Sequence, residues 1–172
     1  PSIAAATFGA MLVAPNVAAA IEGGSGAFMH GHTYLGHPMA CAAALAVQET
    51  IRDERLVDAV RANGARLEAA LVERLGNHAH VGDIRGRGLF RAVELVADRS
   101  TKTPFDPVRR LNARIKREAF ARGLLCYPMG GTIDGRQGDH VILAPPYIAT
   151  ESELADAART LGDANDAPIA AS

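Results

Sequence analysis

One short stretch of the sequence gathers three histidines around a threonine. His30, His32 and His37 lie on either side of Thr33, and no cysteine or carboxylate lies among them. Their spacing matches no established zinc pattern, which argues against a metal site. Two interpretations remain for these residues. The imidazoles satisfy backbone groups of a loop, or the threonine and its neighbours bind an anion.

The surroundings of Thr33 suit a phosphate group. Thr33 lies between Gly31 and Gly36, in a segment that leads directly into a helix opened by Pro38. Proline fits the first turn of a helix, where its missing N–H costs nothing. A hydroxyl and backbone N–H groups then lie near the positive end of a helix dipole, which favours a phosphate dianion. A threonine that merely caps a helix gives the same pattern.

A second candidate lies in the polar loop 130–138. Arg136 lies in this loop, and the family resemblance given below implies that its planar guanidinium pairs with a carboxylate through two hydrogen bonds. The alternative is an ordinary solvated arginine, since arginine prefers the protein surface. Asp134, Asp139 and His140 could be drawn as a metal site, but no dense loop of oxygen ligands accompanies them.

Hydrophobic periodicity and turn residues predict the elements that must hold these side chains. The expected helices cover residues 15–21, 39–51, 56–75, 107–122 and 150–161, and the expected strands cover residues 8–13, 81–84, 89–96, 124–127 and 141–144. The helix at 39–51 is rich in alanine, which lets other backbones approach, and we expect it to be buried. Thr150 and Glu153 predict a capping box. The residues from Asp163 onward are expected to form a frayed tail.

The composition indicates a folded protein. The chain has 172 residues with 48% hydrophobic and 22% charged residues and a net charge of −1, so it can bury a core and has no basic footprint for nucleic acid or an anionic membrane. No apolar stretch reaches membrane-spanning length and the start lacks signal-peptide features, so we expect a cytoplasmic protein. Cys41 and Cys126 are expected to be reduced thiols in the core.

The segment from Phe28 to Leu45 carries a specific resemblance. It reads Phe-Met-His-Gly-His-Thr-Tyr-Leu-Gly-His-Pro-Met-Ala-Cys-Ala-Ala-Ala-Leu. This resembles the Phe-x-His-Gly-His-Thr-Tyr-Ser-Gly-His-Pro signature of class III aminotransferases, pyridoxal-phosphate enzymes of fold type I. Residues 8–13, before this segment, resemble the strand that follows the family's Schiff-base lysine. Residues 81–95 resemble the first strands of its C-terminal domain, and residues 138–148 resemble its last strand and Pro-Pro turn. Leu35 stands where the family usually has serine.

The resemblance implies the C-terminal part of an α/β fold of the fold-type-I pyridoxal-phosphate transferases. Residues 1–50 would end the large domain, 51–76 would form a connecting helix, 77–162 the small α/β domain and 163–172 a tail. The implied cofactor is pyridoxal 5'-phosphate, bound by Thr33 and His32, and Arg136 would bind the substrate carboxylate. The implied enzyme is a homodimer with its active site at the subunit boundary, so Thr33 would serve the partner subunit's cofactor.

The implied reaction moves an amino group from an ω-amino acid or amine to a 2-oxo acid such as pyruvate. The resemblance places the family's Schiff-base lysine at or just before the first residue of this sequence. Lys102 precedes a proline-containing loop and Lys116 lies on the polar side of a helix, so neither replaces it. We therefore expect the chain to be inactive by itself. The alternatives are a non-catalytic interaction module, or half of a split enzyme whose partner chain bears the lysine.

Overall fold

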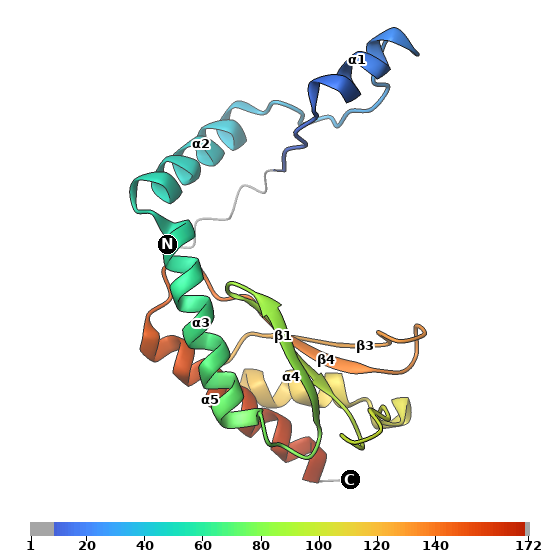
Figure 1. Cartoon of the computed structure of the whole chain (residues 1–172), viewed down its shortest axis with the longest axis vertical. Coiled ribbons are helices and arrows are strands. Elements are labelled where there is room, and N and C mark those ends of the chain that lie inside the picture. Colours follow the sequence, from blue (N-terminus) through green and yellow to red (C-terminus); the bar gives the residue numbers. More distant parts are fainter. Residues whose placement is uncertain (1–8, 171–172) are drawn as a thin grey trace. The chain divides into compact units, whose positions relative to one another are not determined.

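The chain forms two compact units, Pro1–Glu54 and Arg55–Ser172. The computed structural model describes residues 9–170 (Figure 1). The boundary between the units follows helix α2 and coincides with a left-handed backbone at Arg55, whose φ is 52°. The predicted connecting helix at 51–76 is therefore divided, because residues 51–53 belong to one helix and the next begins at Leu56.

The described part of the first unit, residues 9–54, contains two helices, α1 (Pro15–Gly23) and α2 (Pro38–Asp53). Each has a proline in its first turn, as the sequence predicts. Helix α1 ends where the N–H of Gly24 donates to the carbonyl of Ala20 at 3.1 Å. Both helices are thus confirmed, with ends one or two residues beyond the predicted ones.

Two expectations about the first unit are wrong. No residue of α2 is buried, and Leu45 on this helix is 60% exposed. Cys41, also on α2, is exposed rather than part of a core. A helix face is buried only where another layer covers it, and the two helices of this unit do not provide one.

The predicted strand at 8–13 is also not formed in the part that is described. Phe8 lies outside the described residues, and Gly9–Val13 adopt no strand. A strand requires a neighbour that completes its backbone hydrogen bonds. None of the strands found in residues 9–170 pairs with this segment.

The second unit is a two-layer α/β structure (Figure 1). Its antiparallel sheet has the strand order β1-β2-β4-β3. The strands are β1 (Val81–Arg87), β2 (Phe90–Leu95), β3 (Tyr127–Gly130) and β4 (Asp139–Leu143), and the helices are α3 (Leu56–Leu75), α4 (Leu111–Ala121) and α5 (Glu151–Ala170). Pro128 is tolerated in β3 because this strand lies at the edge of the sheet.

The core lies between the sheet and the three helices. Leu67, Leu71 and Leu75 repeat every four residues along α3 and are fully buried. They belong to one apolar cluster with Val93 of β2 and Val141 of β4, which lie opposite each other in the sheet. The amphipathic stripe predicted for residues 56–75 is therefore the face that packs on the sheet.

The turn between β1 and β2 is held tightly against α3. It consists of Gly88 and Leu89 rather than the predicted longer break at 85–88. A Cβ on Gly64 of α3 would lie only 2.5 Å from the Gly88 carbonyl carbon, so the two backbones touch. The buried guanidinium of Arg91 donates to the carbonyls of Gly88 at 2.9 Å and Gly64 at 3.2 Å. It also pairs with Glu68 at 2.9 Å.

Around α4, the structure corrects two predicted boundaries. The Asp106 carboxylate accepts the N–H of Val108 at 2.9 Å and caps a short 3₁₀ helix, η1 (Pro107–Arg109), rather than α4. Arg110 then adopts φ 47°, and α4 begins only at Leu111. At the other end, the Leu124 N–H donates to the Ala119 carbonyl at 2.9 Å. This bond terminates the helix, so the following strand starts at Tyr127 and not at Leu124.

Helix α5 begins as predicted but is longer than predicted. The capping box is confirmed, because the Thr150 N–H donates to the Glu153 carboxylate at 2.8 Å and the Glu153 N–H donates back to the Thr150 hydroxyl at 3.3 Å. The helix continues to Ala170, so the expected frayed tail is helical over its described part. Ala164 and Asn165 on this extension are fully buried.

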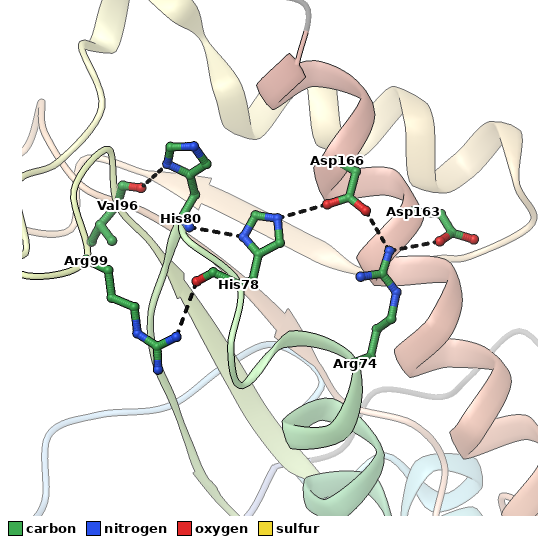
Figure 2. Close-up of polar contacts among 7 residues, drawn as sticks. All are labelled: Arg74, His78, His80, Val96, Arg99, Asp163 and Asp166. Atoms are coloured by element: carbon green, nitrogen blue, oxygen red, sulfur yellow. Dashed lines mark hydrogen bonds and ion pairs between the residues drawn. The ribbon is translucent and has the colours of Figure 1, made fainter.

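A polar cluster fixes the end of α5 to the end of α3 (Figure 2). Arg74 donates to Asp163 at 3.0 Å and to Asp166 at 2.6 Å. The Nε2 of His78 lies 2.9 Å from the other Asp166 oxygen. Because the Nδ1 of His78 accepts the backbone N–H of His80 at 3.1 Å, the His78 proton lies on Nε2 and is donated to Asp166.

Candidate functional site

Thr33 lies in a turn that delivers the chain into α2. The His32 carbonyl accepts the Leu35 N–H at 3.0 Å, and the Tyr34 carbonyl accepts the His37 N–H at 3.1 Å. Gly36 between these bonds has φ 70°, a backbone that glycine adopts without strain. The side chains of His32 and Thr33 are both exposed.

The start of α2 has unsatisfied hydrogen-bond donors. His37 is the N-cap residue and provides no side-chain cap, so Thr33 is not the helix cap that the sequence allowed as an alternative. Pro38 has no N–H, and the next donors in the first turn belong to Met39 and Ala40. Together with the exposed Thr33 hydroxyl, which makes no hydrogen bond to a described residue, this donor set fits the phosphate group of a cofactor.

The neighbouring imidazoles contact one another. The ring of His32 meets the ring of His30 edge-on with centroids 5.0 Å apart, and His30 meets Phe28 in the same way at 5.7 Å. Across residues 9–170, no group of three histidine, cysteine or carboxylate side chains is arranged to hold a metal ion. No helix in the same range is both long and apolar enough to cross a membrane.

Arg136 lies in the second unit, on the loop between β3 and β4. The Asp134 Oδ1 atom accepts the backbone N–H of Arg136 at 2.9 Å and that of Gln137 at 2.7 Å. These bonds, the Gln137 bond first, hold the pKa of the Asp134 carboxyl below its usual range. Sequence reasoning treated Asp134 only as a weak metal candidate. The Asp-Gly pair at 134–135 was the available signal, because aspartate at a turn accepts backbone N–H groups two and three residues on.

The Arg136 side chain is exposed and, within the described part of the chain, its guanidinium makes no ion pair. Several other arginines of the second unit do form ion pairs, including Arg74, Arg85, Arg122 and Arg159. The arrangement therefore presents one cation on a loop whose backbone is fixed. Such a group can bind a carboxylate through two parallel hydrogen bonds.

The two lysines have structural positions in the second unit. Lys102 has φ 58° and its ammonium donates to the carbonyl of Gly82, at the irregularity in β1. Lys116 lies on the exposed side of α4.

Comparison with known proteins assigns the family. The family model for aminotransferase class III matches residues 5–164, which is nearly the whole chain. The chain belongs to the class III aminotransferases. The family predicted from residues 28–45 is thereby confirmed, and so is the fold class.

Relatives of this aminotransferase chain agree in sequence and in structure. It is 43% identical over 150 residues to an aminotransferase of Gibberella zeae, covering 87% of this chain and 29% of the relative. It is 43% identical over 127 residues to adenosylmethionine-8-amino-7-oxononanoate aminotransferase of Nitratidesulfovibrio vulgaris, covering 74% of this chain and 22% of the relative. A PLP-bound aminotransferase mutant from Vibrio fluvialis superposes with a TM-score of 0.75 at 34% identity, covering 90% of this chain and 32% of that one.

Two facts follow from these matches. This aminotransferase chain spans about a third or less of the length of the relatives it matches. The Vibrio fluvialis neighbour is a PLP-bound form.

Proposed function

We propose that this chain forms the C-terminal part of a pyridoxal-phosphate-dependent aminotransferase that moves an amino group from an ω-amino acid or amine to a 2-oxo acid such as pyruvate. The observation that carries the substrate class is Arg136, an exposed guanidinium that forms no ion pair with any of residues 9–170, on a loop with a fixed backbone. Both an ω-amino acid and a 2-oxo acid present a carboxylate that this group can bind.

Thr33 would hold the cofactor. Its hydroxyl donates one charge-assisted hydrogen bond to the phosphate, and the uncapped N–H groups at the start of α2 add to the binding. His32, adjacent to Thr33, would contact the same cofactor. When bound, pyridoxal phosphate supplies an electron sink for the carbon that carries the amino group. In a homodimer with its active site at the subunit boundary, Thr33 would serve the partner subunit's cofactor.

The domain roles follow the same proposal. The first unit would complete the large domain, and the second unit, from α3 to α5, would form the connecting helix and the small domain. Helix α5 replaces the expected tail in this scheme.

The Schiff-base lysine would come from outside this chain, because Lys102 bonds to Gly82 and Lys116 lies on the surface of α4. We therefore expect the isolated chain to be inactive, and to regain amino transfer when it is joined to, or mixed with, a lysine-bearing N-terminal region. The test incubates the chain with pyridoxal phosphate, reduces it with borohydride and locates any adduct by mass spectrometry, alongside an assay of amine transfer to pyruvate. A stoichiometric adduct on either lysine with turnover would contradict the expectation. No transfer in the complete enzyme would favour a non-catalytic interaction module.

A further inference from the structure

The loop 131–138 that carries Arg136 is built to hold one backbone shape. The Ile133 N–H donates to the Gln137 carbonyl at 3.0 Å, and the Gly135 N–H donates to the Gly131 carbonyl at 3.0 Å. Gly138 has φ 91°, and a Cβ there would lie 2.7 Å from the Thr132 hydroxyl.

Asp134 provides the bonds that fix Arg136 itself. Its Oδ1 atom accepts the N–H groups of Arg136 and Gln137, and its Oδ2 atom lies 3.3 Å from the Gln137 side-chain amide. Both oxygens are thus occupied by neutral N–H donors. The Asp134 carboxylate makes no ion pair with the Arg136 guanidinium, which remains exposed.

We propose that Asp134 is the positioning residue for Arg136, because its carboxylate holds the Arg136 main chain in the direction from which the guanidinium meets a substrate carboxylate. This inference rests on the proposed role of Arg136. Holding a long side chain at its base reduces the conformational freedom that is lost when it binds. The expected effect is selective. Substitution of Asp134 should raise the KM for substrates that carry a carboxylate and leave the KM for other substrates unchanged.

If Asp134 acted only through its negative charge, its removal would have the opposite effect on the binding of a carboxylate. Removing a negative charge next to Arg136 would make the loop more positive and would strengthen carboxylate binding. Loss of positioning weakens it. Asp134→Asn separates the two explanations, because the amide oxygen still accepts the two backbone N–H groups while the charge is gone.

The test compares two amino acceptors in the complete enzyme, namely pyruvate, which has a carboxylate, and butanal, which has none. We expect Arg136→Ala to raise the KM for pyruvate by roughly 10- to 100-fold, the effect of losing a charge-assisted bond. Asp134→Ala should raise it roughly three- to tenfold, and Asp134→Asn should stay within about twofold of the parent. With an amine donor that lacks a carboxylate, the KM for butanal should not change in either Asp134 variant. The double variant D134A/R136A should match R136A, because both act through one contact.

A matched control is available in the same unit. The Asp98 Oδ1 atom accepts the N–H groups of Ser100 at 2.7 Å and Thr101 at 3.4 Å in an exposed loop, an arrangement like that at Asp134. Asp98→Ala should change neither KM. In the isolated chain, hydrogen exchange at the Arg136 and Gln137 amides should accelerate by about tenfold or more in D134A and return toward the parent rate in D134N.

The outcomes separate the inference from the function on which it rests. An unchanged KM for pyruvate in R136A overturns both the proposed role of Arg136 and the inference. A raised KM in R136A with parental values in D134A overturns the positioning role alone. Equal changes for pyruvate and butanal in D134A reduce Asp134 to a structural turn residue, and a lower KM for pyruvate in D134A and D134N assigns the effect to charge. If D134A fails to fold, Asp134→Ser, whose hydroxyl accepts one N–H bond, gives the same comparison.

Discussion

Thr33 and Arg136 are the two candidate ligand-binding residues, and each can contact a ligand for a different structural reason. The Thr33 hydroxyl has no partner among the described residues, and it precedes a helix whose first N–H groups are uncapped. Arg136 is exposed, but its backbone is fixed by Asp134. Both residues could be proposed as candidates from the sequence, Thr33 from its glycine-flanked position before a helix and Arg136 from its guanidinium and the family resemblance. The hydrogen bonds that Asp134 accepts from the Arg136 and Gln137 amides could be seen only in the geometry of the loop.

Thr33→Ala tests the phosphate contact. We expect pyridoxal-phosphate affinity in the complete enzyme to fall by about 1.5–3 kcal/mol, or roughly 10- to 100-fold, because one charge-assisted hydrogen bond is lost. Turnover at saturating cofactor should change much less. Since Thr33 does not cap α2, the melting temperature of the isolated chain should not change. Thr33→Ser keeps the hydroxyl and should restore most of the affinity. Unchanged cofactor dissociation in the alanine variant would remove this assignment.

The two thiols should differ in reactivity. Burial raises the pKa of Cys126 to about 11, whereas Cys41 is exposed on α2. At pH 8 only about 0.1% of Cys126 is then the reactive thiolate, so iodoacetamide should label Cys41 at least about tenfold faster. Mass spectrometry of timed samples from C41S and C126S variants measures each rate separately. Unfolding in urea should bring the two rates together, and equal rates in the folded chain would show that Cys126 is not shielded.

At the scale of elements, the sequence predicted those features of the helices that depend on residues close together in the chain. The stripe of Leu67, Leu71 and Leu75 could be predicted because its apolar residues recur along one helix. The Thr150–Glu153 capping box could be predicted because its two residues lie within one turn. The extension of α5 from residue 162 to Ala170 could not be predicted from the sequence. It depends on Arg74 and on packing of small residues against elements about 90 positions away, which the residues of α5 do not reveal.

The polar cluster that joins α3 to α5 should make the free energy of unfolding vary with pH in the acid range. Desolvation raises the pKa of Asp166, but the hydrogen bond and charge of Arg74 and then the contact with His78 outweigh it, so its pKa lies below the usual value. A carboxyl whose pKa is lower in the folded chain than in the unfolded chain, where it is about 4, stabilises the fold at pH values above about 4. This contribution is lost as the pH falls through the pKa of the folded chain.

Asp166→Asn measures that contribution. At pH 5 we expect the variant to be less stable than the parent by about 0.5–1 kcal/mol, a value kept small because the carboxylate is partly exposed. At pH 3 the difference should shrink toward zero. Asp156→Asn, which removes an exposed pair with Arg159 on the same helix, serves as the control and should show little difference at either pH. Urea unfolding at the two pH values gives the free energies, and a difference that grows at pH 3 would reverse the assignment.

At the scale of the whole molecule, the two units differ in what they bury. Every fully buried apolar residue in the described part of the chain belongs to the second unit. The first unit instead exposes large apolar side chains, among them Leu12 at 92%, Met29 at 92% and Leu45 at 60%. Exposed apolar surface of this kind favours association.

We therefore expect the chain to self-associate as its concentration rises, whereas a fragment of residues 55–172 should melt cooperatively and associate less. Sedimentation velocity over a wide concentration range measures the first, and a thermal scan measures the second. Leu45→Glu should weaken association without lowering the melting temperature, because this residue contributes to no core. A chain that stays monomeric throughout would show that its exposed apolar surface does not drive association.

The contact between Gly64 and Gly88 limits which sequences this fold can accept. In a saturation library, both positions should tolerate almost nothing but glycine, although neither has a side chain to lose. An alanine at position 64 would push the Gly88 turn away from α3, and Arg91 would then lose its bond to the Gly64 carbonyl, 27 residues earlier in the chain. The added methyl group would therefore destabilise the fold chiefly by leaving the buried positive charge of Arg91 with fewer hydrogen-bond partners. A steric change on α3 would thus have an electrostatic cost in the hairpin formed by β1 and β2.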